Sequence, residues 1–201
     1  SLVGSEMCIR DRIEQPFRNE IPIYLAAVGL KNVELTAEIA EGWLPFMYSP
    51  IKGEDIYKES LSNGFKKSGD SDKKNKFEIV TTVFGRVCEE DEIDQYLYPA
   101  RNIYTLYVGG MGAKSKNFYY NLFCEYGYED IADELQNLYL SGNKKESEDL
   151  FPKELLNELT LVGTKKDIEK KLETWKDSNI TEISLSLPID FETVKFIKEL
   201  L

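Results

Sequence analysis

The chain has 201 residues, of which 42% are hydrophobic and 30% are charged, and it carries a formal net charge of −11. This composition is typical of a globular protein, and no apolar run approaches the length of about 18 residues that a membrane-spanning helix needs. The excess of acidic side chains argues against nucleic-acid binding, which depends on clustered Lys and Arg. The short basic runs are interpreted as solvated faces: Lys73, Lys74 and Lys76; Lys165 and Lys166; Lys170 and Lys171.

The sequence contains no histidine, which excludes Ser-His-Asp chemistry and most zinc sites, and we expect no metal site. Its cysteines, Cys8, Cys88 and Cys124, are widely spaced and odd in number, which favours a reducing compartment and therefore the cytoplasm. Without a histidine to activate a thiol, Cys88 and Cys124 are interpreted as structural rather than nucleophilic. Any catalysis must use a cofactor, carboxylates, tyrosines, lysines or the backbone.

Residues 1–12, SLVGSEMCIRDR, differ from the rest of the chain. They lack the positive start, long apolar centre and small-residue cleavage site of a signal peptide. They resemble a translated sequencing adapter. We therefore expect a non-native leader at 1–12 and a single domain over 13–201, with the natural protein beginning further upstream.

The first half of the domain alternates between strand and helix patterns. The apolar run at 21–27 predicts a buried strand, and the spacing of Val33, Ala37 and Ala40 predicts a helix from Lys31 that Gly42 closes. The segments that follow are predicted to be a strand at 42–46, a surface helix at 51–67 carrying Ile56, Leu61 and Phe65, a polar loop at 68–76, and a β-branched strand at 77–84.

The second half begins with a long helical region. Ile93, Leu97, Ala100 and Tyr104 suit one helix face, with Pro99 kinking the helix or starting a new segment. The segments that follow are predicted to be a tight loop at 108–112, a helix through Ile131, Leu135 and Leu138 ended by Gly142, a helix opened by a Thr164–Asp167 capping box with Ile168, Leu172 and Trp175 inside, a strand at 181–187 ended by Pro188, and a closing helix through Val194, Ile197 and Leu201.

Four strand–helix units, with one helical insertion before the last strand, predict an α/β fold with a parallel sheet and right-handed crossovers. Four such units make half of a (β/α)8 barrel, whose usual length is about 250 residues. A half-barrel leaves two sheet edges open, which a stable monomer avoids. We therefore expect the second half of a (β/α)8 TIM barrel and an incomplete chain, with a four-stranded open α/β domain as the alternative.

The loop after the first predicted strand is suited to an anion. Its small residues and Gly29 let backbone N–H groups approach a ligand, and the following helix start favours negative charge. Lys31 lies in the first helical turn, where the helix dipole disfavours a cation unless a phosphate is bound. The alternative is a tight turn with a solvated Lys31.

Residues 21–50, IPIYLAAVGLKNVELTAEIAEGWLPFMYSP, resemble the segment PIYLAA-x-GPKN-x-L-x-AEIADGWLP of the luciferase-like monooxygenase family, close to its coenzyme F-420 (F420)-dependent oxidoreductase branch. The resemblance continues through LYVGGMGAKSKNFYYNLF, GYEDIADELQNLYLSG and LVGTKKDIEKKLETWKDSNIT, and covers nearly everything from about residue 13. It implies a bacterial luciferase-like barrel that binds coenzyme F420, with FMN as the alternative.

The resemblance also assigns binding residues. It implies that a phosphate-binding loop is lined by Ala26, Ala27, Val28, Gly29, Lys31 and Asn32, and that Phe46 touches the cofactor. Two departures are visible. Leu30 replaces the usual proline, which loosens the turn and spares the N–H donors, and Phe46 replaces a hydroxyl residue of several relatives, which puts a hydrogen bond in doubt.

Two further features are interpreted from the residues. The segment 109–118 is a candidate gate for the substrate pocket or a contact for an acidic cofactor tail through Lys114 and Lys116, with a solvated surface loop as the alternative. Tyr24 and Trp43 are interpreted as packing residues rather than a stacking platform.

The function implied is an oxidoreductase that transfers hydride between the deazaflavin coenzyme F420 and an unknown small organic substrate, as a homodimer when full length. Family residues beside the reacting face come mostly from earlier strands, so we assign no catalytic residue and expect the chain alone to be inactive. The alternatives are an FMN-dependent luciferase-like monooxygenase and a non-catalytic barrel paralogue. A phosphate-sugar lyase or isomerase barrel is disfavoured because the last strand is not followed by the expected glycines.

Overall fold

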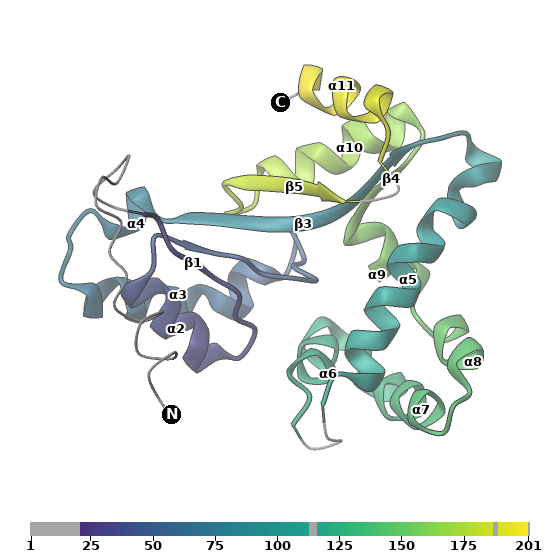
Figure 1. Cartoon of the computed structure of the whole chain (residues 1–201), viewed down its shortest axis with the longest axis horizontal. Coiled ribbons are helices and arrows are strands. Elements are labelled where there is room, and N and C mark those ends of the chain that lie inside the picture. The colour runs from purple at the N-terminus through teal and green to yellow at the C-terminus, as the bar shows by residue number, and fades with distance from the viewer. Residues whose placement is uncertain (1–20, 113–115, 187–188, 201) are drawn as a thin grey trace, which may run out of the picture.

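The computed structural model describes residues 21–112, 116–186 and 189–200 (Figure 1). The leader predicted for residues 1–12 lies outside the described residues, as do Lys114, Pro188 and Leu201. Within the described ranges, no helix combines the length and apolar character that crossing a membrane requires.

The strands form one parallel sheet of five strands: β1 (Tyr24–Leu25), β2 (Gly42–Trp43), β3 (Glu78–Val87), β4 (Thr160–Gly163) and β5 (Glu182–Ser186). β1 pairs with β2 and β2 with β3, while β3 also pairs with β4 and β5, all in parallel. Phe84 is in register with both Thr160 of β4 and Ser186 of β5, so these two strands lie on opposite edges of β3. Among the described residues the sheet is open and does not close into a barrel.

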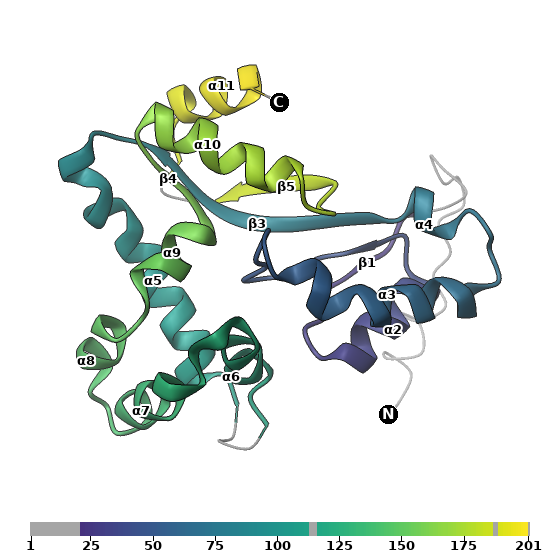
Figure 2. The ribbon, with the colours of Figure 1, turned by 180° about the vertical axis from the view of Figure 1, so that it is seen from behind.

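Helices connect and flank these strands. They are α2 (Leu30–Ile39), α3 (Gly53–Ser68), α4 (Lys73–Lys76), α5 (Ile93–Gly110), α6 (Phe118–Phe123), α7 (Glu129–Leu140), α8 (Lys144–Asp149), α9 (Lys153–Glu158), α10 (Lys165–Lys176) and α11 (Phe191–Leu200), with a 3₁₀ turn η1 (Glu90–Glu92) and a π-helical segment η2 (Cys124–Tyr128). Figures 1 and 2 show α2 and α3 on one side of β3, α10 and α11 on the other, and α5 to α8 grouped beyond its carboxyl end. The helical insertion predicted before the last strand is therefore confirmed.

The spacing of apolar residues located several helices correctly. Val33, Ala37 and Ala40 are fully buried on α2 and after its end. On α10, Thr164 and Asp167 form the predicted capping box, and Ile168, Leu172 and Trp175 are buried as predicted. On α11, Ile197 is buried and Val194 is 42% exposed, so only part of the predicted inner face packs against the molecule.

The structure corrects the predicted end of α2. The helix is capped by Ala40, and Gly42 begins strand β2 as predicted, although that strand ends at Trp43 rather than at Phe46. A Cβ at Gly42 would lie 2.3 Å from the ring of Tyr24, so the glycine makes room for that ring across the β1–β2 pair. The sequence pattern treated Gly42 as the end of the helix, because a contact with a residue of the neighbouring strand cannot be recognised from local sequence.

The polar segment 68–76 is also not wholly a loop. Lys73–Lys76 form the short helix α4 after an N-terminal turn at Asp72, and Lys76 forms an ion pair with Asp72 at 3.1 Å. A single helical turn made only of charged and polar residues has no apolar periodicity by which sequence could identify it. The prediction of a loop was therefore wrong at 73–76.

Strand β4 was missed altogether. Its four residues are all buried, and it lies on β3 from Phe84 to Val87. A four-residue buried strand has no alternation that sequence can reveal, because every position is apolar or small. The four-strand prediction was therefore one strand short.

The predicted loop at 108–112 is largely helical. α5 continues through Gly110, with Pro99 inside it. A Cβ at Gly109 or Gly110 would lie 2.6 or 2.5 Å from Tyr139 of α7. The two glycines thus allow α5 and α7 to pack closely. They are needed for this contact between helices and do not form a turn.

Candidate functional site

The loop after β1 leads directly into the amino terminus of α2. Gly29 is the N-cap residue, and its carbonyl accepts hydrogen bonds from the N–H groups of Asn32 and Val33 at 2.9 and 3.0 Å. The first N–H groups of a helix have no acceptor within it, and Gly29 has no side chain that could cap them. The first turn contains no acidic residue and does contain Lys31. This end of α2 is therefore electropositive.

Gly29 is required for space rather than for backbone conformation. Its φ of −67° and ψ of 135° are accessible to any residue. A Cβ at this position would lie 2.7 Å from the ring of Phe118 at the start of α6. The loop and the helical insertion therefore meet at Gly29.

A cavity of about 470 Å³ lies at the carboxyl ends of the strands. Its lining includes five of the predicted loop residues and Phe46, and none of the described residues around it is charged. The predicted residues that line this loop cavity are Ala26, Ala27, Val28, Gly29, Asn32 and Phe46.

Lys31 lines a second cavity, of about 830 Å³, on the other side of the same loop. Val28, Gly29 and Asn32 border both cavities. All seven predicted binding residues thus lie around one loop, with Lys31 separated from Phe46 by the loop itself.

Phe46, which follows β2, lines the loop cavity together with aromatic residues of the helical insertion. Its ring centroid lies 4.7 Å from that of Tyr107, 5.6 Å from that of Tyr104 and 6.2 Å from that of Tyr119. Burial raises the pKa of Tyr119 to about 12, so its hydroxyl stays protonated near neutral pH. The wall of the loop cavity is therefore aromatic and uncharged.

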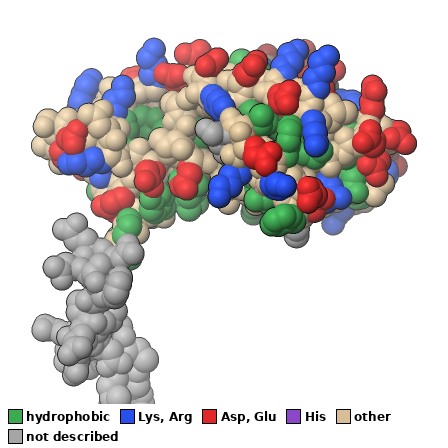
Figure 3. Space-filling view, turned by 90° about the horizontal axis from the view of Figure 1, so that it is seen from above, with side chains coloured by type: hydrophobic (Ala, Val, Ile, Leu, Met, Phe, Trp, Pro, Cys, Tyr) green, Lys and Arg blue, Asp and Glu red, His purple; other side chains and the backbone are tan. Residues whose placement is uncertain are grey.

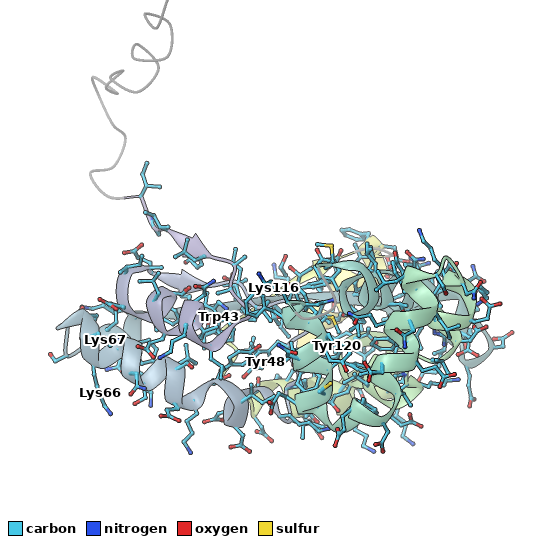
Figure 4. The ribbon with its side chains drawn as sticks, turned by 90° about the horizontal axis from the view of Figure 1, so that it is seen from below. Trp43, Tyr48, Lys66, Lys67, Lys116 and Tyr120 are labelled. Carbon is cyan, nitrogen blue, oxygen red and sulfur yellow. The ribbon has the colours of Figure 1, made fainter. Side chains whose placement is uncertain are left out.

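Trp43 anchors the loop after β1 through a hydrogen bond. It is fully buried, and its Nε1–H donates a hydrogen bond to the carbonyl of Ala27 at 2.8 Å. Its ring packs edge-on against that of Tyr48, which Figure 4 labels beside it, and against that of Tyr57. The interpretation of Trp43 as a packing residue is confirmed, and its hydrogen bond to the loop after β1 is a feature that sequence reasoning missed.

The segment 109–118 lies only partly at the site. Met111 and Phe118 line the loop cavity, whereas Gly109 and Gly110 belong to α5 and Lys114 lies outside the described residues. Lys116 is exposed, on the side where α6 approaches α2 (Figure 4). The segment therefore borders the cavity at both of its described ends.

Asn117 fixes the start of α6 beside the cavity. Its side-chain oxygen accepts hydrogen bonds from the N–H groups of Tyr119 and Tyr120, and its amide donates to the carbonyls of Tyr107 and Val108 at 2.9 and 2.8 Å. It thereby joins the end of α5 to α6. Sequence reasoning missed Asn117, although asparagine is a preferred N-cap residue.

The two cysteines within the described residues, Cys88 and Cys124, show no sign of activation. Cys88 is buried and Cys124 is half-buried, and burial is the main cause that raises the pKa of each thiol. Both thiols are therefore protonated at neutral pH, in keeping with the structural interpretation.

The fold and the site define a parallel α/β protein with an uncapped helix start and an uncharged cavity at the carboxyl ends of its strands. Residues 6–182 match the model of the family described as luciferase-like monooxygenase. The chain belongs to this family, as its sequence suggested.

Individual relatives are similar across most of the chain. A putative coenzyme F420-dependent oxidoreductase of Mycobacterium tuberculosis is 36% identical over 169 residues, which are 84% of this chain and 48% of the relative. The chain thus spans about half the length of this relative.

Two solved structures share the fold at 16% sequence identity. The coenzyme F420-dependent tetrahydromethanopterin reductase of Methanopyrus kandleri matches with a TM-score of 0.67, over 90% of this chain and 50% of that one. An F420-dependent secondary alcohol dehydrogenase in complex with an F420–acetone adduct matches with a TM-score of 0.59, over 91% and 48%.

Proposed function

We propose that this chain supplies the phosphate-binding side of the cofactor site in a coenzyme F420-dependent oxidoreductase that acts on a small organic substrate. The observation that carries the proposal is the uncapped start of α2, where Gly29 and Lys31 face two cavities at the carboxyl ends of the sheet. The F420-dependent relative, 36% identical over most of the chain, supports the choice of cofactor.

The residues present fit the phosphate-bearing part of such a cofactor. The N–H groups at the start of α2 and the ammonium of Lys31 can bind a phosphate, since both are positive and the first turn holds no acidic residue. Asp55 and Glu125 line the same cavity as Lys31, and neither of them lines the uncharged loop cavity. Gly29 keeps a side chain away from these donors, and Trp43 holds the preceding carbonyl of Ala27. The chain therefore binds and orients the group through its backbone.

The aromatic wall is suited to the exclusion of water. Phe46 and Tyr119 present uncharged rings to the loop cavity, and no charge competes there with a bound ring system. Bound coenzyme F420 supplies hydride transfer. The chain's own part is to position that cofactor and to keep one side of it dry.

We also propose that catalysis needs residues beyond this chain, because the chain spans about half of the relative's length. On this proposal the domain is residues 13–201, the working enzyme is a cytoplasmic homodimer without nucleic-acid or membrane partners, and this chain alone is inactive. The substrate is left unassigned.

Titration with coenzyme F420, followed by its fluorescence, tests the cofactor. The protein is measured both as the 201-residue chain and as the longest open reading frame that contains it. We expect quenching in the micromolar range, at least tenfold weaker in Gly29→Leu, because the new side chain fills the space beside Phe118. Glu173→Leu, an exposed site on α10, is the matched control and should bind normally.

Titration with FMN separates the alternatives. Tight FMN binding without F420 binding would assign the protein to the monooxygenase branch that the family description names. Binding of neither cofactor by the longer reading frame would leave a non-catalytic barrel and would end the proposal.

A further inference from the structure

Lys171 differs from the other lysines of its helix. Lys165, Lys166 and Lys170 are exposed on α10. Acidic and basic side chains are interspersed over the face of the molecule that Figure 3 shows. Lys171 is half-buried, and its Nζ donates a hydrogen bond to the carbonyl of Val162 at 2.8 Å. The prediction of a solvated face therefore fails for this one side chain of the basic run.

The ammonium of Lys171 has little to stabilise its charge. Val162 is buried, and its carbonyl is a neutral acceptor. Asp167, one turn earlier, uses Oδ2 to accept hydrogen bonds from the N–H and hydroxyl of Thr164. No ion pair to Lys171 is found among the described residues.

The protonation of Lys171 follows from these surroundings. Burial lowers its pKa from 10.5 to about 8, while the charge of Asp167 acts in the opposite direction. At neutral pH the neutral amine, which is the nucleophilic form, is thus far more populated than in an ordinary exposed lysine.

Lys171 also lines a cavity of about 810 Å³ between α9 and α10. This cavity shares no lining residue with the two cavities at the α2 loop. Its other charged lining residues are Glu90, Asp91 and Asp94 from η1 and α5, Lys153, Glu154 and Glu158 from α9, and Asp167 and Lys170 from α10. Lys153 and Asp94 form an ion pair at 2.9 Å across it. The acidic excess disfavours anionic reagents and admits uncharged ones.

We propose that Lys171 is a site of Nζ-acylation by small uncharged thioesters that enter the cavity between α9 and α10. The neutral Nζ attacks the thioester carbonyl carbon, so that an N–C bond forms and the C–S bond breaks. The departing thiolate takes up the proton that the amine loses, and no oxidation or reduction occurs. The amide product keeps one N–H for the carbonyl of Val162 and carries no charge, so the fold accommodates it.

The test is competitive acetylation of the whole chain with S-acetyl-N-acetylcysteamine, an uncharged thioester, followed by digestion and mass spectrometry. Lys170 is the internal control, since it is exposed, adjacent in sequence and lines the same cavity. At pH 7 we expect Lys171 to be acetylated at least about tenfold faster than Lys170, because each unit of pKa changes the neutral fraction tenfold. The rate at Lys171 should level off above pH 8 to 9, while that of an ordinary lysine keeps rising to pH 10 or above.

Two further measurements make the result decisive. In 8 M urea the preference should fall to about one, because it depends on the folded surroundings. A preference that persists in urea would reflect local sequence and would overturn the proposal. Equal or slower labelling of Lys171 in the folded chain at every pH would overturn it as well.

Discussion

The hydroxyl of Tyr126 donates a hydrogen bond to the carbonyl of Met47 at 2.7 Å, and it accepts one from the N–H of Ser49 at 3.0 Å. Met47 has a φ of 57°, which is unusual for a residue with a large side chain, and it follows the cavity residue Phe46 directly. Burial raises the pKa of Tyr126 well above its ordinary value, so the hydroxyl keeps its proton. A residue of the helical insertion therefore holds the backbone that positions the cavity wall.

Tyr126→Phe should lower the free energy of unfolding by about 1–3 kcal/mol, because it leaves a buried carbonyl and a buried N–H without their partner. Urea denaturation measures the effect. Tyr120→Phe is the control, since its hydroxyl bonds Asp133 at 3.1 Å near the surface, and it should change stability by less than about 0.5 kcal/mol. Equal losses in the two variants would contradict the role given to Tyr126.

Gly109 and Gly110 should respond differently to alanine. Alanine gains about 1 kcal/mol of helix propensity at either position. At Gly109 the new Cβ would lie 2.6 Å from the Cβ of Tyr139, close to the backbone of α7, and at Gly110 it would lie 2.5 Å from Cε1 at the far end of the ring. Overpacking should therefore leave Gly109→Ala destabilised by about 1–2 kcal/mol and Gly110→Ala nearly neutral. Thermal or urea denaturation of both variants decides, and the reverse order would show that α5 and α7 do not pack in this way.

Lys31→Gln should weaken binding of coenzyme F420 about three- to tenfold, because it removes one positive charge from the start of α2. The dependence of the affinity on salt should also decrease, since exposed charges are screened. Lys165→Gln is the matched control, a lysine in the first turn of α10 that lines neither cavity at the loop. Identical affinities for Lys31→Gln and the parent protein would remove Lys31 from the proposed site.

Lys171 should give stability a specific pH dependence. Its pKa is lowered from 10.5 to about 8 in the folded chain, so between these values the unfolded chain binds more protons and folding becomes more favourable as pH rises. The unfolding free energy of the parent protein should gain about 1–3 kcal/mol relative to Lys171→Met between pH 7 and pH 10.5. Lys170→Met, measured in parallel, should show a difference from the parent that is nearly constant with pH. A constant difference for Lys171→Met would mean that its amine titrates normally.

The sequence alone determined those features that depend on local periodicity and on a long similar segment. The spacing of Val33, Ala37 and Ala40 predicted α2, and the pairing of Thr164 with Asp167 predicted the start of α10, because a helical face and a cap are built from residues a few positions apart. The family was likewise predicted from the similar segment at residues 21–50, and the parallel α/β fold from the alternation of strand and helix patterns along the chain.

The tertiary structure decided what depends on contacts between distant segments. Gly42 was predicted to end the helix before it, and in the structure it leaves room for the ring of Tyr24. Gly109 was predicted to lie in a tight loop, and in the structure it allows Tyr139 to pack closely against α5. The hydrogen bonds from Trp43 to Ala27 and from Tyr126 to Met47 join residues 16 and 79 positions apart, and the desolvation of Lys171 arises from burial that no local pattern encodes. Packing selects these residues through neighbours far along the chain, so only the folded molecule reveals which of them shape the site.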